Sequence, residues 1–308
     1  MGSEVRLTAQ VADESRALRA FEKAFDEFDR LDRLLSVWKP GSDVLRLNAE
    51  AGHAPVQVSP ETLEVLRTAR QVSEWTGGKF DVTFGALSGL WKFDQDQDDQ
   101  IPRPADVRAR LPEVDFTAVE LNGARGTAYL SRPGTRVHLG GIGKGYAVDR
   151  AAAILRADGI SDFLIQAGGD LYASGTRGDR PWRAGIRDPR GPVDRIFAAM
   201  NLHDETFSTS GDYERYFIRD GRRYHHILDP DEGVPARGCR SVTIVARQGV
   251  LADALSTGVF VLGPRTGMAL IEKLPDVEGV IVTESNEVLV SSGLTARLER
   301  LQSPTDAP

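Results

Sequence analysis

A carboxylate and a hydroxyl lie one helical turn apart in the stretch Ala252-Asp253-Ala254-Leu255-Ser256-Thr257. The apolar residues around them predict a helix from about residue 252 to 262, closed by Gly263. Asp253 and Thr257 are at i and i+4, so they share one helix face. These hard oxygen ligands suit Mg²⁺, which keeps several waters and takes further ligands from substrate phosphates. The alternative is a helix-start acid that the helix dipole stabilises.

Glycines are dense in the stretch from His138 to Asp149, with four of them in the six positions 140–145. The pattern predicts the end of a strand, a tight turn and a helix over about residues 144–155. Bare backbone that opens onto a helix N-terminus favours anions, and a pyrophosphate would fit. The spacing matches neither the dinucleotide-binding nor the Walker pattern. A tight turn without a ligand is the alternative, with Lys144 either a phosphate-binding cation or a solvated lysine.

Two adjacent histidines, His225 and His226, precede Asp229-Pro230. Neighbouring residues of a strand point to opposite faces, so a histidine pair on one zinc ion is disfavoured. A single histidine that acts as a general base or phosphate ligand is favoured over a zinc ion bound by both histidines. The alternative is a surface histidine, or a core histidine held by hydrogen bonds.

Trp38 stands at the predicted end of a long helix, where an indole either packs in the core or offers a stacking surface to a planar ring. Residues 209–212 (Thr-Ser-Gly-Asp) have the composition of a tight polar turn. The acidic run of residues 94–100 is expected to be a solvated loop, because it lacks the glycine and terminal glutamate of an EF-hand.

Composition limits the class of protein. The 308 residues are 41% hydrophobic and 27% charged, as expected for a folded protein of one large or two intimate domains. The net charge of −7, with acids spread widely, argues against a nucleic-acid partner. The single Cys239 excludes an internal disulfide and a multi-cysteine metal site. No apolar run reaches the roughly 18 residues that span a bilayer. With no secretory leader at the N-terminus, we expect a cytosolic protein or the mature part of an exported one.

The order of predicted elements favours an α+β fold with mixed, largely antiparallel sheets and flanking helices, in one domain over residues 1–308. Residues 1–11 alternate as a strand does, and Asp13 is a candidate N-cap for the helix that follows. The predicted core face of that helix consists of Leu18, Phe21, Phe25, Phe28, Leu31 and Leu35. Ser59-Pro60 begins a second helix, and Asp220-Gly221 predicts a hairpin turn.

Eight blocks of the sequence also match one family in that family's order. They are residues 1–3, 35–43 with Leu47-Asn48, 78–83, 140–149, 168–170, 208–212, 225–230 and 252–257. On these blocks the sequence resembles the FAD:protein FMN transferases, the ApbE family, over nearly its whole length. The resemblance implies two intimate lobes with FAD bound between them.

The resemblance also implies roles for individual residues. Met1 and Trp38 would contact the flavin, with the aromatic residue stacked on it. The remaining FAD contacts would come from Lys79, Phe80, Asp81, His138, Lys144 and Ile227. The metal ligands would be the main-chain carbonyl of Gly141 and the side chains of Asp253 and Thr257. Family members usually carry Asp at the position of His138, so affinity for the adenosine side of FAD, or its pH dependence, is expected to differ here.

The implied reaction is Mg²⁺-dependent phosphoryl transfer. A Ser or Thr hydroxyl of an acceptor protein attacks the FMN phosphorus of FAD, and AMP leaves. We expect His226 to be the general base, because the unperturbed pKa of histidine lies near neutrality, with Asp253 as the second choice. An FAD pyrophosphatase that uses water, a non-catalytic flavin-binding protein and an ATP-preferring nucleotide hydrolase are the alternatives.

The resemblance further suggests an acceptor and a location. Acceptors in the family are often membrane redox subunits with a Ser/Thr-containing motif, and many members are periplasmic lipoproteins. We therefore expect a protein that works outside the cytoplasm, with contact to a membrane only through a lipoprotein leader that this chain lacks.

Overall fold

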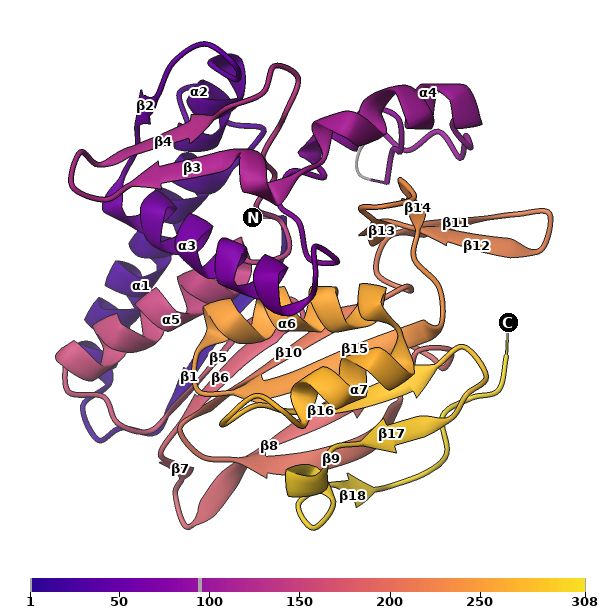
Figure 1. Ribbon diagram of the computed structural model, residues 1–308. Coiled ribbons are helices and arrows are strands. Elements are labelled where there is room, and N and C mark those ends of the chain that lie inside the picture. The colour runs from indigo at the N-terminus through magenta and orange to yellow at the C-terminus, as the bar shows by residue number, and fades with distance from the viewer. Residues whose placement is uncertain (1, 94–95, 308) are drawn as a thin grey trace.

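The structure is a computed structural model that describes residues 2–93 and 96–307 of the chain. Figure 1 shows a larger lobe of layered sheets and helices, and a smaller lobe at the top of the view around α2, α3 and the short strands β2 to β4. Neighbouring strands are antiparallel in each sheet. The predicted α+β class with largely antiparallel sheets is therefore confirmed.

A central sheet organises the larger lobe, with its strands in the order β1-β5-β6-β10-β15-β16-β17. The strands are β1 Val5–Ala9, β5 Phe163–Ala167, β6 Asp170–Ser174, β10 Glu205–Gly211, β15 Cys239–Ala246, β16 Glu278–Thr283 and β17 Val288–Val290. Side chains alternate between its two faces: in β16, Ile281 packs with the helices, whereas Val280 and Val282 pack with a second sheet. Both faces of the central sheet are thus buried.

Helices cover one face of this sheet (Figure 1). They are α1 Glu14–Leu35, α5 Gly143–Ala157, α6 Gly249–Leu262 and α7 Pro264–Ile271. Eleven of the fourteen residues of α6 are buried, because it packs against other helices as well as the sheet. Within residues 2–93 and 96–307, no helix combines the length and apolar character needed to cross a membrane.

The second sheet covers the other face, in the order β18-β9-β8-β7. Its strands are β7 Thr176–Arg177, β8 Arg180–Arg187, β9 Ile196–Leu202 and β18 Glu299–Arg300. Trp182, Phe197 and Met200 fill the space between the sheets together with Phe207 of the central sheet. The larger lobe therefore has three layers: helices, central sheet and second sheet.

The smaller lobe and two hairpins complete the fold. The helices are α2 Asp43–Ala49, α3 Pro60–Trp75 and α4 Pro104–Arg110, and the strands are β2 Val56–Gln57, β3 Val119–Asn122 and β4 Thr127–Leu130. The hairpins are β11 Tyr216–Arg219 with β12 Arg222–His225, and β13 Leu228–Asp229 with β14 Val234–Pro235. Asp220 and Gly221 have φ of 51° and 72°, as a tight hairpin turn requires, so that predicted turn is confirmed.

The predicted first helix is confirmed, but its predicted core face is wrong in part. Asp13 caps α1 by accepting from the Arg16 N–H at 3.0 Å. Leu18 and Phe25 are 55% and 42% exposed, respectively. The buried positions are Ala17, Ala20, Ala24, Phe28, Leu31 and Leu35. Small side chains let α1 approach its neighbours closely, and packing of this kind does not follow from hydrophobicity alone.

The prediction of a tight turn at residues 209–212 is also wrong. Residues 205–211 form β10, which pairs with β6 and β15 inside the central sheet. Serine and threonine favour turns by composition, but here their hydroxyls find partners in the interior. Ser208 Oγ donates to Asp170 Oδ1 at 2.5 Å, and Thr209 Oγ1 lies 2.9 Å from Thr243 Oγ1 across the strands. Polar residues thus occupy a buried strand because each hydroxyl is hydrogen-bonded.

Helices α5 and α6 approach each other closely at two glycines. A Cβ atom on Gly145 would lie 2.0 Å from the carbonyl oxygen of Gly249 and 2.7 Å from Asp253 Cβ. A Cβ atom on Gly249 would lie 2.6 Å from the carbonyl oxygen of Gly145. Because both contacts involve backbone, no side-chain movement could relieve them.

Each of these helices is capped by a carboxylate of the other. Asp253 Oδ2 of α6 accepts from the Gly145 N–H of α5 at 3.0 Å. Asp149 of α5 accepts from the Gly249 and Val250 N–H groups of α6 at 2.6 and 2.9 Å. Within the described residues, neither helix has a side-chain cap of its own at the position before its first residue. The two carboxylates satisfy amides that a helix start leaves without intrahelical partners.

We expect Gly145→Ala to destabilise the protein by about 3 kcal/mol, because the methyl group meets backbone of α6. Gly143→Ala is the matched control on the same helix: its Cβ atom would meet only Leu35 Cδ1, at 3.9 Å. That variant should change stability by less than about 1 kcal/mol. Urea unfolding followed by circular dichroism measures both, and equal stability of the two variants would contradict the close contact.

We expect Asp149→Ala to lower the free energy of unfolding by about 2 to 3 kcal/mol, since two amides at the start of α6 lose a charged acceptor. Asp149→Asn keeps one oxygen acceptor and should fall between that variant and the unmodified protein. Chemical denaturation at pH 7.5 gives the three values. A loss as large for Asn as for Ala would show that the oxygen acceptor contributes little.

Candidate active site

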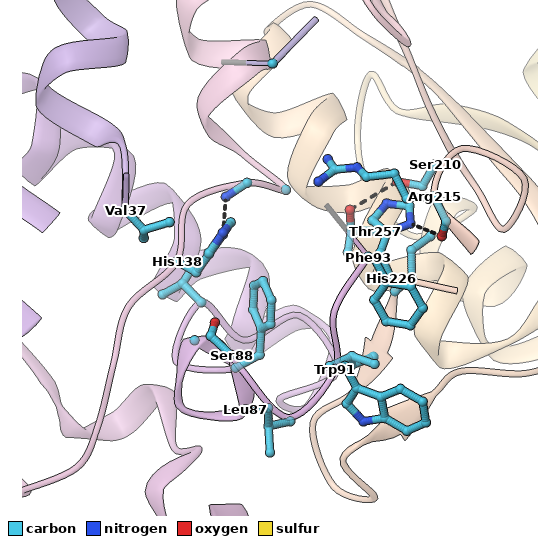
Figure 2. Close-up of a pocket in the computed structure, with 18 of the residues that line it drawn as sticks. Val37, Leu87, Ser88, Trp91, Phe93, His138, Ser210, Arg215, His226 and Thr257 are labelled. Carbon is cyan, nitrogen blue, oxygen red and sulfur yellow. Dashed lines mark hydrogen bonds between the residues drawn. The ribbon is translucent and has the colours of Figure 1, made fainter. Parts of the chain in front are cut away.

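A cleft of about 540 Å³ is lined by segments from both lobes. Among the predicted site residues that the structure describes, every one lines it: Trp38, Lys79, Phe80, Asp81, His138, Gly141, Lys144, His226, Ile227, Asp253 and Thr257. Met1 lies outside the described residues. In Figure 2, His138 and Val37 lie on one side of the cleft, and Ser210, Thr257, His226 and Arg215 on the other. Residues far apart in the sequence are therefore brought to one cavity.

The glycine-rich turn forms part of the cleft wall. Gly140 N–H donates to His138 Nδ1 at 3.0 Å, which makes Nδ1 an acceptor and leaves the ring hydrogen of the neutral imidazole on Nε2. A Cβ atom on Gly141 would lie 3.1 Å from Thr257 Oγ1, so this bare backbone faces the hydroxyl of α6 directly. The first turn of α5 begins two residues later, at Gly143. The predicted turn and helix are thus present, and the helix starts within one residue of the predicted position. The strand predicted before the turn is wrong, because residues 137–139 belong to no strand and only an isolated bridge at Arg136 precedes them.

Lys144 occupies the centre of a buried ionic cluster. Its Nζ lies 3.2 Å from Asp170 Oδ2, 3.6 Å from Asp253 Oδ1 and 3.4 Å from the Gly140 carbonyl oxygen. Burial opposes the charge of Lys144, but the two carboxylates outweigh it and raise the pKa of the ammonium. Burial and the negative charge of Asp170 raise the pKa of Asp253. With all three ionised, the cluster holds one excess negative charge.

Hydroxyl groups surround this cluster. Ser210 Oγ lies 3.1 Å from Thr257 Oγ1 and 2.8 Å from Ser256 Oγ, and the first contact is drawn in Figure 2. Helix α6 starts at Gly249, earlier than predicted, so Asp253 is its fifth residue. The simple interpretation of Asp253 as an acid in the first turn of its own helix is therefore wrong. Its carboxylate instead faces the start of α5, on the same face of α6 as Thr257.

The two adjacent histidines have different environments. His225 is buried, with Nε2 3.0 Å from the Ala236 carbonyl oxygen and Nδ1 accepting from the Ile227 N–H at 3.3 Å. His226 lines the cleft, and its Nδ1 lies 3.3 Å from the Arg215 carbonyl oxygen. A carbonyl only accepts, so Nδ1 is the donor and Nε2 is left as the acceptor. His225 holds its loop together, and His226 is the histidine available to a ligand.

The pKa of His226 departs from the value assumed from the sequence. Its enclosure in the cleft and the positive charge of Arg215 lower the pKa to about 3. The imidazole is therefore neutral at physiological pH. It can accept a hydrogen bond throughout that range, but it is a weaker base than an ordinary histidine.

Residues 79–81 line the cleft in different ways. Lys79 Nζ contacts Asp229 and Asp231, each at 2.8 Å. Asp81 accepts from Thr83 N–H and Oγ1 and from the Phe116 N–H, so its oxygens organise the loop. Burial raises the pKa of Asp81 to about 6. Phe80 is buried with its ring against Gly141. Lys79 and Phe80 thus shape the wall, and Asp81 holds it in place.

Trp38 is 69% exposed and borders the same cleft. The core-packing alternative for this residue is therefore wrong, and the indole is available to stack on a planar ring. The buried side chain of Ile227 forms an apolar part of the cleft wall, between His226 and the hairpin of β13 and β14.

Sequence reasoning missed Asp170, Ser210 and Arg215 as candidate site residues. Asp170 follows the Gly168-Gly169 turn between β5 and β6, and a carboxylate directly after two glycines is a signal that could have found it. The composition around Ser210 predicts a turn, and a turn does not place it opposite Thr257. Arg215 has no distinguishing sequence pattern, and only the tertiary structure brings it to the cleft.

The chain is similar in sequence to proteins named FAD:protein FMN transferase. A relative from Treponema pallidum named FAD:protein FMN transferase is 35% identical over 297 residues, covering 92% of this chain and 82% of the relative. A protein of the same name from Escherichia coli K12 is 31% identical over 278 residues, covering 89% of this chain and 79% of the relative.

The chain is also similar in fold to solved structures of ApbE proteins. The crystal structure of an ApbE protein from Thermotoga maritima is similar with a TM-score of 0.86 and 33% identity, covering 97% of this chain and 96% of that one. The flavin transferase ApbE from Vibrio cholerae has a TM-score of 0.85 and 27% identity, with 96% of each chain covered. Residues 1–281 match the model of the ApbE family. On this match, and on relatives aligned over most of its length, the chain belongs to the ApbE family.

Proposed function

We propose that this protein transfers FMN from FAD to a Ser or Thr hydroxyl of an acceptor protein and releases AMP. The observation that carries the proposal is the half-buried Lys144, placed at the start of α5 between Asp170 and Asp253 and opening into the cleft. An ammonium and a helix N-terminus together suit a pyrophosphate. Relatives named FAD:protein FMN transferase support the transfer of FMN.

The donor atoms near Lys144 suit Mg²⁺. In the described residues, no group of three His, Cys, Asp or Glu side chains could hold an ion, so hydroxyl, carbonyl and phosphate oxygens are needed as well. The Gly141 carbonyl, Asp253 and Thr257 offer three kinds of hard oxygen, beside an ionic cluster with excess negative charge. Mg²⁺ bound there would supply Lewis-acid polarisation and a template for the phosphate oxygens.

The protein's own groups would position the substrate. Lys144 and the N-terminus of α5 face the pyrophosphate, and the exposed indole of Trp38 stacks on the flavin. His138 lines the cleft where a carboxylate is usual in the family, so an imidazole ring would contact FAD there in place of an acid. The transferring phosphoryl group is thereby fixed for in-line attack, which is the main catalytic requirement of this reaction class.

His226 would orient the attacking hydroxyl. The Arg215 carbonyl fixes its tautomer, which leaves Nε2 to accept a hydrogen bond from the acceptor's Ser or Thr. A low pKa is tolerable in this role, because phosphoryl transfer through a loose transition state needs little proton removal before the attack. Asp253 remains the second choice for the base, although its proposed role as a metal ligand competes with that function.

One experiment separates transfer from the alternatives. The protein is incubated with FAD and Mg²⁺, with and without candidate acceptor subunits, while AMP is measured and acceptor mass is recorded. FMN-modified acceptor together with acceptor-dependent AMP is the expected result. AMP and FMN without acceptor would identify an FAD pyrophosphatase, and bound FAD without any AMP would identify a flavin-binding protein. An acceptor among membrane redox subunits and a location outside the cytoplasm belong to the same proposal and rest on the family resemblance alone.

We expect Thr257→Val to raise the Mg²⁺ concentration needed for half-maximal AMP release by about 10- to 100-fold, because the isosteric side chain lacks the hydroxyl. Thr257→Ser keeps the hydroxyl and should stay within about threefold of the unmodified protein. Mg²⁺ titrations at saturating FAD measure the effect. Equal Mg²⁺ requirements for Val and Ser would remove Thr257 from the proposed metal site.

We expect His226 to stay neutral from pH 8 to pH 5, as followed by imidazole NMR with His226→Gln for assignment. Because the folded-state pKa is lowered, the unfolded chain takes up a proton below about pH 6.5 while the folded protein does not. The free energy of unfolding should therefore fall as the pH drops through this range, and less steeply in His226→Gln. An imidazole that titrates near pH 6.5 would contradict the enclosed environment.

A further inference from the structure

Residues 301–307, called here the terminal segment, are bound to the body of the protein, although the family match ends at residue 281. Pro304 is buried, and its carbonyl accepts from Asn286 Nδ2 at 3.0 Å. Thr305 donates to Asp188 Oδ2 through its N–H at 3.0 Å and its hydroxyl at 2.7 Å. The Thr305 carbonyl accepts from Arg240 Nη1 at 3.1 Å. In Figure 1 the segment runs past β17 to the side of the molecule that carries the β11–β12 hairpin.

The residues that hold the terminal segment also hold a buried ion pair. Asp188 Oδ1 accepts from the N–H groups of Arg190 and Gly191, each at 3.0 Å. Arg190 then makes a bidentate contact with Asp212, with both Nη–Oδ distances 2.7 Å. The two side chains are 7% and 8% exposed. Arg240 joins the same group, because its carbonyl accepts from the Asp212 N–H at 3.0 Å.

Asp212 begins the connection from β10 to β11, and this connection reaches the cleft. Gly211, Glu214 and Arg215 line the cleft on either side of Asp212. The carbonyl of Arg215 accepts from the His226 N–H at 3.2 Å and lies 3.3 Å from His226 Nδ1. The orientation of the His226 ring therefore depends on where this connection is held.

We infer that the terminal segment is a positioning device for the active site, acting through Asp188, Arg190 and Asp212 on the Arg215 carbonyl and His226. The inference rests on the proposed function of this cleft. A fork-to-fork Arg–carboxylate pair restrains both distance and orientation, and it is most restrictive when buried. None of these residues touches the reacting atoms, so each of them is a positioning residue for His226.

The first test removes residues 303–308 from the protein. We expect kcat for FMN transfer to fall on the order of 10-fold, because a small displacement of an orienting group is costly, with little change in the KM for FAD. The His226 imidazole NMR signal should also change from a single Nδ1–H tautomer to a mixture. A stable truncated protein with normal kcat and an unchanged His226 signal would overturn the inference.

A second set of variants covers the case in which truncation prevents folding. Thr305→Val removes one hydrogen bond to Asp188 and should lower kcat by about threefold, while Thr305→Ser should restore it. Ser303→Ala, at an exposed position of the same segment, is the control and should leave kcat unchanged. Equal kcat for Val and Ser at position 305 would overturn the inference, as would a loss of stability in Thr305→Val without any loss of kcat.

The readouts separate this inference from the proposed function. If the unmodified protein transfers no FMN, the proposed function fails, but the His226 tautomer still reports whether the segment positions that ring. If the unmodified protein is active and neither kcat nor the tautomer responds, only the positioning inference fails.

Discussion

The close contact between α5 and α6 is the constraint on which the rest of this structure depends. Two glycines allow backbone to meet backbone, and two carboxylates, Asp149 and Asp253, cap the opposite helix. A side chain at either glycine would separate the helices and remove both caps. The same contact brings Lys144 of one helix beside Asp253 of the other. The close contact between α5 and α6 is therefore needed both to pack the core and to assemble the site.

Charge at this contact is unevenly balanced. Burying two carboxylates with one ammonium is unfavourable unless hydrogen bonds and further charge compensate. Ser208 and the Gly145 amide supply hydrogen bonds, but two carboxylates share the one ammonium of Lys144. Burial, and then the neighbouring charge of Asp170, raise the pKa of Asp253. A divalent cation in the proposed site would relieve this imbalance, which connects the electrostatics of the fold to phosphoryl transfer.

The two sides of the cleft are held in position by different interactions. The glycine-rich turn presents bare backbone and His138 on one side, whereas the other side carries Ser210 and Thr257. His226 lies on that second side, next to hairpins and a connecting loop. Such a loop has few regular hydrogen bonds, so its position depends on specific anchors. The Arg190–Asp212 pair and the terminal segment are anchors of that kind. Rigid helices thus face the phosphate end of the proposed substrate, and an anchored loop faces the attacking group.

The amino-acid sequence by itself determined the local elements and the chemical inventory of this protein. Periodicity and capping residues predicted α1 and α3, glycine density predicted the turn before α5, and the i, i+4 spacing predicted that Asp253 and Thr257 share a face. These features depend on near neighbours in the chain, so a sequence reveals them.

Only the tertiary structure decided which polar residues are buried and which of them meet. Composition favours a turn over residues 209–212, but residues 209–211 end the strand β10, because its hydroxyls find partners on other strands and helices. Periodicity predicts Leu18 and Phe25 in the core, but they are exposed, because alanines occupy the packed face of α1. The pKa of His226, the ion pairs of Lys144 and the role of Asp170 arise from groups distant in sequence. Their energies depend on burial and long-range contacts, and composition or spacing does not encode these directly.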